Sequence, residues 1–335
     1  MLPYPPAFPS CWILPFMPTI RSTSYKGWNS LALVTDRVEL IIPLDIGPRV
    51  ISCSLDGGPN LFATVAAELG KTGEADWKIR GGHRLWHAPE VPPRNYQPDN
   101  GPITATKLPG GKGLRVDQPV EEKTGIRKSF TIEALSDTDF KVTHSLKNEN
   151  MWAVELSPWA LTVMARDSYT AIPFNPKIAW GKTLVPDYAM VPWTYTDFTD
   201  PVWDFHRDYI GIHVAKSTQP QKLGLTNFPG WAANWQKGGT FVKYWAVKTG
   251  VPYPDFGCSF ETYVCDFMNE LESLGPLQKL EPGATTTLVE YWGLFDNLPK
   301  PDKDSIFSGK FRPVIDAWLH KLKAEKVRAK AAKSR

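Results

Sequence analysis

Two glutamates, Glu270 and Glu272, stand two residues apart in a stretch whose composition is typical of a β-strand. Successive side chains of a strand point to opposite faces, so we expect both carboxylates on the same face. Like charges held close together raise the pKa of at least one group, and a carboxyl group with a pKa near neutrality can act as a general acid or base. Glu270 is therefore a candidate catalytic residue and Glu272 a candidate substrate contact. The alternative is a solvated or ion-paired surface pair.

His83 and Arg84 directly follow two glycines, Gly81 and Gly82. Glycine adopts positive φ angles readily and allows a close backbone approach, so we expect a tight turn here. An imidazole and a guanidinium delivered by such a turn suit the hydroxyl or carboxylate groups of a ligand. His83 is therefore the second candidate catalytic residue, and Arg84 is a candidate binding residue. The alternative is a histidine bonded to a backbone carbonyl, beside an arginine in a structural ion pair.

His83 and His87 are four residues apart, a spacing that would place two metal ligands on one face of a helix. The neighbouring glycines and prolines argue against a helix. In a strand this spacing spans about 13 Å, so only a loop folded back on itself could bring both ligands to one ion. No glycine-rich phosphate loop followed by Lys and no GxSxG segment occurs. We expect neither a metal nor a cofactor, and we take His87 as a candidate substrate-binding residue.

The remaining candidates are polar residues of a proline-rich loop and aromatic residues that would stack on a ligand. Polar residues in such loops commonly line the mouth of a pocket. Tryptophan offers a flat apolar face to a ligand, although a tryptophan more often fills the core. The candidate substrate-binding residues of these kinds are Trp86, Glu90, Tyr96, Asp99 and Trp193, with Trp203, Asp197 and His206 as further candidates.

Most of the chain consists of short runs rich in Val, Ile, Thr, Phe and Tyr, separated by clusters of Gly, Pro, Asn and Asp. This pattern predicts antiparallel strands joined by turns, and thus an all-β protein of two layered sheets. In the run Phe140–Leu146 the apolar side chains share one face with His144. The expected strands are Ser30–Thr35, Val38–Pro43, Val50–Leu55, Ile126–Leu135, Phe140–Leu146, Ala153–Met164, Tyr209–Val214, Thr240–Val247, Glu261–Leu274 and Thr285–Phe295.

Three segments are expected along the chain. Residues 1–24 are rich in proline and predict a disordered leader, and residues 25–298 form the sandwich domain. Residues 299–335 form a C-terminal helix with a basic, solvated tail, because apolar residues recur there at helical spacing. Residues 173–208 alternate little and are expected to form long loops over one face, which in a compact domain are usually functional.

Charge and cysteine content exclude several classes of protein. The 335 residues carry 38 basic and 35 acidic side chains, a formal net charge of +3, which argues against a dedicated nucleic-acid-binding protein. The sequence has no apolar stretch of about 18 residues, so no membrane span is expected. No basic residue precedes Arg21, which argues against a signal peptide and favours the cytoplasm. The four cysteines match no zinc or disulfide pattern and are expected to be buried thiols.

Three stretches together resemble proteins of the galactose-mutarotase-like superfamily. The first is Tyr25–Phe62, with its Gly-Pro-Arg turn at Gly47. The second, Lys78–Glu90, resembles a mainly bacterial branch of that superfamily, and its Arg-Gly-Gly sequence at Arg80 is similar to that of hexose-6-phosphate mutarotases. The third, Glu261–Gly283, resembles the segment that carries the catalytic glutamate of mutarotases.

The resemblance implies a large antiparallel β-supersandwich and a carbohydrate ligand. In an aldose 1-epimerase, a base takes the proton of the anomeric hydroxyl while an acid protonates the ring oxygen. Glu270 and His83 are the candidates for these two roles, and tryptophans would stack on the apolar face of the sugar. The chain departs from the family pattern at Ser157–Met164, because this segment lacks the histidine expected there.

Three functions stay open: an epimerase-type isomerase, a non-catalytic sugar-recognition protein, and a polysaccharide lyase or hydrolase on the same fold. An epimerase needs an acid and a base on opposite sides of one sugar-sized pocket. A shallow groove lined by tryptophans favours recognition. A deep channel with Tyr96, His83 and Arg84 around a carboxylate-sized space favours a lyase that acts on uronic acids. In each case the expected partner is a carbohydrate, not a nucleic acid or a membrane, and the oligomeric state stays open.

Overall fold

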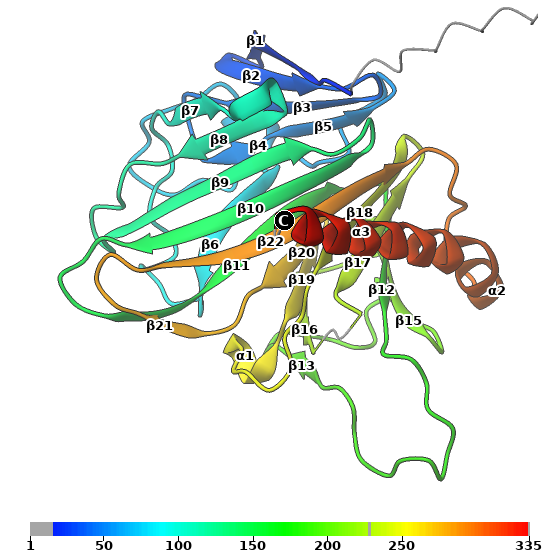
Figure 1. The fold of residues 1–335 in the computed structure, drawn as a ribbon. Coiled ribbons are helices and arrows are strands. Elements are labelled where there is room, and N and C mark those ends of the chain that lie inside the picture. Colours follow the sequence, from blue (N-terminus) through cyan, green and yellow to red (C-terminus); the bar gives the residue numbers. More distant parts are fainter. Residues whose placement is uncertain (1–15, 227–228, 334–335) are drawn as a thin grey trace, which may run out of the picture.

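Two large β-sheets pack face to face in the computed structural model, which describes residues 16–226 and 229–333 (Figure 1). Within these ranges, neighbouring strands of the sheets pair in antiparallel fashion, for example β10 with β22 and β11 with β20. Antiparallel strands can follow one another through short turns, which suits the frequent Gly, Pro and Asn clusters of the sequence. The predicted all-β sandwich is confirmed.

The larger sheet has ten strands in the described part of the chain, in the order β14-β15-β12-β17-β18-β22-β10-β9-β8-β7. Its β22 has the bounds expected from the sequence, and the inward side chains of β10 include His144 as predicted. The ten strands are β7 (Thr104–Lys107), β8 (Gly113–Asp117), β9 (Ile126–Ala134), β10 (Asp139–Asn148), β12 (Tyr169–Pro173), β14 (Trp203–Phe205), β15 (Tyr209–His213), β17 (Trp231–Gln236), β18 (Gly239–Trp245) and β22 (Thr285–Phe295).

The second sheet has eight strands over the same described ranges, in the order β13-β16-β19-β20-β11-β6-β4, with β21 paired to the start of β11. The single long strand expected over Glu261–Leu274 is instead the hairpin β19–β20, which turns at Asp266 and Phe267. The strands are β4 (Arg49–Val50), β6 (His83–Ala88), β11 (Val154–Ala165), β13 (Met190–Pro192), β16 (Gln221–Leu225), β19 (Phe260–Cys265), β20 (Met268–Leu274) and β21 (Gln278–Leu280).

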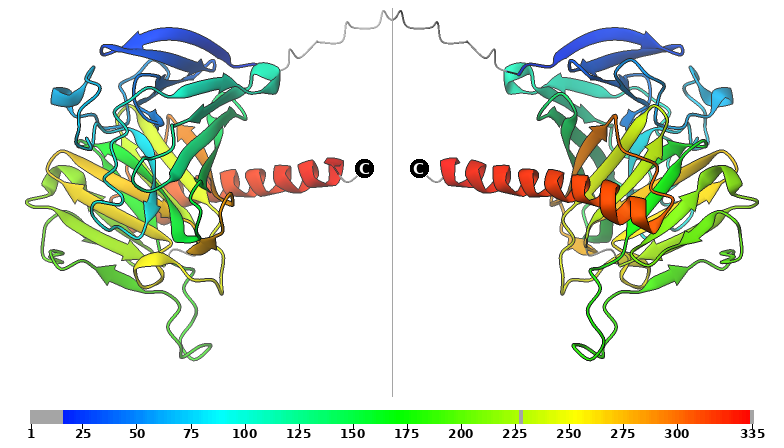
Figure 2. Two further views of the ribbon diagram at one scale, coloured as in Figure 1. Left: turned by 90° about the vertical axis from the view of Figure 1, so that its left-hand side faces the viewer. Right: turned by 90° about the vertical axis from the view of Figure 1, so that its right-hand side faces the viewer.

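A small sheet of four strands covers one end of the sandwich (Figure 2). It consists of β1 (Thr19–Tyr25), β2 (Trp28–Val34), β3 (Val38–Pro43) and β5 (Ser52–Leu55). The expected disordered leader therefore needs a correction, because residues 19–24 pair with β2 along their whole length. Residues 1–15 of that leader lie outside the described residues.

The C-terminal helix packs on the outer face of the ten-stranded sheet (Figures 1 and 2). A short turn of helix, α2 (Asp304–Ile306), and a π-type turn (Phe307–Phe311) lead into α3 (Arg312–Lys333). Phe311, Ile315 and Trp318 of this region pack against aromatic side chains of the sheet. The inner faces of the two large sheets enclose the main core, so the outer face of the eight-stranded sheet is left for a ligand.

The connections contain only short helical turns in the described ranges. The cysteines Cys53, Cys258 and Cys265 are buried and unpaired, as expected, whereas Cys11 lies outside the described residues. None of the helices described here has the length and apolar character needed to cross a lipid bilayer. The short turns are the 3₁₀ turns Ala66–Glu68, Pro109–Gly111 and Val214–Lys216, and α1 (Pro254–Gly257).

Candidate functional site

Strand alternation on the eight-stranded sheet decides which side chains can meet a ligand. On β20, Leu271 points into the core between the sheets, whereas Glu270 and Glu272 point to the outer face, as the sequence predicts. On β6, Arg84 and Trp86 point outward, and His83 and Leu85 point inward. The outward residues of neighbouring strands therefore gather over the middle of the sheet.

These outward side chains line a cavity of about 460 Å³, a volume typical of sites for small molecules. The cavity is rich in aromatic rings and contains both acidic and basic groups. Five residues expected from the sequence line it together: Arg84, Trp86, Glu90, Tyr96 and Glu270. The other residues that line it are Trp77, Ile79, Trp159, Leu161, Tyr195, Lys222, Tyr263, Cys265, Phe267 and Met268.

Arg84 and Glu270 form an ion pair in this pocket. Nη1 of Arg84 lies 2.8 Å from Oε1 of Glu270, and both side chains are almost completely buried. The guanidinium also lies over the rings of Trp86, at 4.9 Å, and Trp77, at 5.4 Å, which fixes its plane. Nε of Arg84 has no hydrogen-bond partner among the described residues, and Oε1 of Glu270 is engaged in the ion pair with Arg84. Both side chains line the cavity, where a polar ligand can compete for the atoms of the ion pair.

Lys222 of β16 forms the second charged group of the pocket. Its ammonium nitrogen lies 2.9 Å from Glu261, 3.3 Å from Glu272 and 3.8 Å from Glu90. The same nitrogen lies over the rings of Trp159 and Trp193, at 4.7 Å from each. A buried ammonium needs such compensation, because burial without a counter-charge costs several kcal/mol.

The carboxylates around Lys222 have perturbed protonation. Burial raises the pKa of Glu272 to about 7, against the opposing effect of the Lys222 ammonium. Burial also raises the pKa of Glu261 well above its ordinary value. Burial alone would lower the pKa of Lys222, but the charges of Glu272 and Glu261 hold it well above the ordinary value. Lys222 therefore stays protonated, and the surrounding carboxylates can hold a proton near neutral pH.

Tyr96 and Glu90 form the outer wall of the pocket. The Tyr96 hydroxyl donates a hydrogen bond to Oε1 of Glu90. Burial and this carboxylate raise the pKa of Tyr96, so the phenol stays protonated and remains a donor. The Tyr96 ring packs edge-on against Trp77 and Trp86, which connects the loop to the aromatic floor of the pocket.

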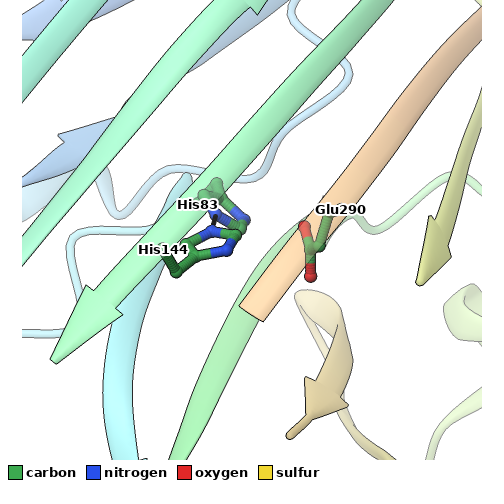
Figure 3. Close-up of side chains that lie close together, drawn as sticks. All are labelled: His83, His144 and Glu290. Carbon is green, nitrogen blue, oxygen red and sulfur yellow. Dashed lines mark hydrogen bonds between the residues drawn. The ribbon is translucent and has the colours of Figure 1, made fainter. Parts of the chain in front are cut away.

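His83 lies outside the pocket, between the two large sheets (Figure 3). Its Nε2 lies 2.7 Å from Nε2 of His144, and its Nδ1 lies 2.9 Å from the Thr162 hydroxyl. Nδ1 of His144 donates to the carbonyl of Leu288, so its Nε2 accepts from His83 when both rings are neutral. Burial lowers the pKa of both imidazoles, which favours these neutral rings. His83 and Glu270 were expected to lie on opposite sides of one sugar, but they lie on different faces of the sheet and cannot do so.

His83, His144 and Glu290 lie close enough to be considered as metal ligands (Figure 3). The carboxylate of Glu290, however, already accepts from Ser273 and Trp292 and pairs with Lys243 at 2.9 Å. Lys243 reaches across from β18 and supplies the positive charge that a metal would otherwise bring. The polar atoms of this cluster already have hydrogen-bond or ion-pair partners without a metal. We therefore interpret the cluster as a link between the two sheets.

Several other expected site residues have structural partners away from the pocket. His87 points between the sheets, where Nε2 lies 3.4 Å from Glu121. Asp99 forms a buried ion pair with Arg49 at 2.7 Å, beside a different cavity. Trp203 is buried in the core. Trp193 contacts Lys222 at the edge of the pocket, and Glu272 lies beneath its floor.

The further candidates of the long loop region also lie away from the pocket. Asp197 accepts hydrogen bonds from Thr199 within its own turn. His206 pairs with Asp204 and stacks on Tyr209 at a centroid distance of 4.2 Å. Neither side chain is part of the lining of the pocket.

Sequence reasoning missed important residues of the site. Lys222 stands between the expected strands Tyr209–Val214 and Thr240–Val247, in the five-residue strand β16, which was not expected from the sequence. Trp159 lies in the segment that lacks the expected histidine, and its indole N–H donates to Glu272 at 2.9 Å. Tyr195 follows β13 within the long loop region. Alternation within their strands could place Trp159, Glu261 and Tyr263 on one face, but their neighbours Trp86, Glu272 and Glu270 follow only from the strand order.

Comparisons with known proteins agree on the fold. No protein-family model and no curated protein matches the sequence. A TPR-domain-containing protein from Parabacteroides distasonis has a TM-score of 0.54 and 13% identity, over 84% of this chain and 54% of that one. A Synechocystis protein has a TM-score of 0.53 and 11% identity, over 88% and 100%. A galactose mutarotase-like protein from Clostridium acetobutylicum has a TM-score of 0.51 and 13% identity, over 83% and 98%.

Identities this low show the fold alone. The chain has the fold of galactose-mutarotase-like proteins, as the sequence resemblance implied. It spans about half of the Parabacteroides protein, so the match to that protein concerns one part of it.

Proposed function

We propose that this protein binds a carbohydrate in the pocket over β6, β11, β16, β19 and β20. The observation that carries the proposal is the set of aromatic walls around the Arg84–Glu270 ion pair in a sugar-sized cavity. Aromatic faces suit the apolar side of a pyranose, and charged hydrogen-bond partners suit its hydroxyls. The galactose-mutarotase-like fold supports the same ligand class.

The charges of the pocket favour a neutral sugar. Arg84 is neutralised by Glu270, and Lys222 is surrounded by Glu90, Glu261 and Glu272. An anionic sugar would find no unpaired cation among the described lining residues and would be repelled by the carboxylates. A lyase acting on uronic acids is therefore disfavoured, since Arg84 is occupied and His83 lies outside the pocket.

Recognition without catalysis fits the site best, because no histidine lines the pocket in the described part of the chain. Anomer interconversion is the second candidate. It is favoured by the presence of two separate carboxyl groups, Glu270 and Glu90, in one pocket. Glu270 would take the proton of the anomeric hydroxyl, and Glu90 in its protonated form, positioned by the Tyr96 hydroxyl, would supply its proton to the ring oxygen.

Thermal unfolding in the presence of neutral pyranoses, uronates and short oligosaccharides tests the binding proposal. A neutral pyranose at about ten times its Kd should raise the Tm by about 2 °C. Glu270→Gln should reduce this shift, whereas Glu122→Gln, an exposed position at a different cavity, should leave it unchanged. The proposal is contradicted if only uronates raise the Tm, or if none of the sugars raises it.

Anomer exchange of the bound sugar, followed by NMR, separates the two candidates. Epimerase activity predicts enzyme-dependent exchange that Glu270→Gln lowers by about 100-fold or more. Recognition predicts that exchange stays at its rate in buffer while the sugar still binds.

The three described cysteines are free thiols, which supports the cytoplasm as the place where we propose that this binding occurs.

A further inference from the structure

A long loop between β12 and β13 stands away from the body of the molecule at the end opposite the small sheet (Figures 1 and 2). Its tip is ordered by local contacts: the N–H of Lys182 donates to the carbonyl of Ala179, and Trp180 bridges to Thr183. Gly181 has a φ of +83°, which a residue with a side chain would adopt only under strain. The projection is therefore a turned finger, which we call the 176–186 finger.

The finger exposes apolar side chains to an unusual degree. Trp180 is 94% exposed, Leu184 85%, Val185 72% and Ile178 59%. Single exposed apolar residues are common, but four within eight residues, on a segment that covers nothing beneath it, mark a surface that meets another molecule. The finger does not contribute to the lining of the sugar pocket, so the proposed function leaves it unexplained.

The charges of the finger have one sign. Residues 176–186 contain two lysines, Lys177 and Lys182, and no acidic residue. Lys177 sits at the base over the rings of Phe174 and Tyr188, at 4.7 and 5.6 Å, while Lys182 is exposed near the tip. Apolar and aromatic side chains flanked by lysines are the composition that enters the interface of a bilayer with anionic headgroups.

We propose that the 176–186 finger docks on an anionic lipid surface, with Trp180 and Leu184 inserted between the headgroups. A narrow projection cannot cover a flat protein surface, whereas a fluid lipid layer closes around it and buries all four apolar side chains. This contact lies at the membrane surface and involves no segment that crosses the membrane. It departs from the sequence-based expectation that a membrane is not a partner, which rested on the lack of long apolar stretches.

Flotation of the full chain with vesicles tests the proposal. Phosphatidylcholine vesicles that contain phosphatidylserine should bind the protein, and pure phosphatidylcholine vesicles should bind it less. The double variant Trp180→Ala/Leu184→Ala should lower the bound fraction by at least about tenfold. Lys177→Gln/Lys182→Gln should remove the difference between the two kinds of vesicle.

Trp152→Ala is the matched control, because Trp152 is also an exposed tryptophan but lies between β10 and β11, outside the finger. It should float like the unaltered protein. The proposal is overturned if the unaltered protein does not bind, or if the finger variants bind equally well while keeping the same Tm. It is also overturned if the double variant converts a dimer to a monomer in sedimentation, since the finger would then contact a second copy.

Discussion

Lys222 connects more of the pocket than any residue expected from the sequence. It compensates three carboxylates and contacts two indole rings, and its own charge is buried with them. Glu270 and Arg84 complete a second pair on the neighbouring strands. The pocket is thus built from paired charges, and removal of one partner leaves the other without compensation.

Lys222→Met should lower the free energy of unfolding by about 3 kcal/mol, because Glu261 and Glu272 would then lie buried without their cation. Urea unfolding at neutral pH measures this loss. Lys279→Met removes a lysine from an exposed pair with Glu281 and should leave stability unchanged. Equal effects of the two substitutions would contradict this account of the pocket.

The neighbours His83 and Arg84 show what could be predicted at the scale of residues. Arg84 lines the pocket and His83 does not, because the side chain that reaches the pocket depends on which face of β6 each one occupies. A strand buried on both faces has no polar side, so alternation of residue type did not distinguish the two. Glu270 was placed correctly because Leu271 marks the inner face of β20.

At the scale of elements, β6, β10 and β22 are joined across the core by the histidine pair and Glu290. Burial lowers the pKa of His83 and His144, so the native state binds no proton on these rings where the unfolded chain would. Stability from this source is present above the unfolded pKa of about 6.5 and falls as the pH drops below it, by up to about 1.4 kcal/mol per pH unit for each ring.

The free energy of unfolding should fall between pH 6.5 and pH 5, and His83 and His144 each contribute to this fall. His144→Asn should therefore remove about half of the part of the fall that the two rings cause. Urea unfolding at both pH values gives the comparison. The variant will be less stable at neutral pH, because it loses the bonds to His83 and Leu288, so the quantity to compare is the change with pH. An unchanged pH dependence would mean that His144 is already protonated in the native state.

The turn that leads into β6 was expected from its two glycines, and both have positive φ, +94° for Gly81 and +76° for Gly82. A Cβ on Gly81 would lie 2.0 Å from the carbonyl oxygen of Ala63. Gly81→Ala should thus lower stability by about 3 kcal/mol or more and displace Arg84 from the pocket. Gly101→Ala, where a Cβ meets open space, should be nearly neutral in the same thermal unfolding experiment.

For the whole molecule, the sequence predicted the sandwich, the closing helix and the strands β3 and β22 with their observed bounds. Local patterns of apolar residues determine such elements. The strand order does not follow from local patterns, since β11 lies between β6 and β20, which are about 180 residues apart in the sequence. Lys222, Tyr195 and Trp159 join the site only through this long-range order, so sequence reasoning could not assemble it completely.

We propose above that a neutral sugar binds over β6 and β20. A crystal structure of the protein with the neutral pyranose that gives the largest rise in Tm tests it most directly. We expect the sugar ring in the pocket, against the aromatic walls and within hydrogen-bond distance of Arg84 or Glu270. A sugar bound only at another cavity, or a pocket that stays empty at saturating sugar, would contradict it.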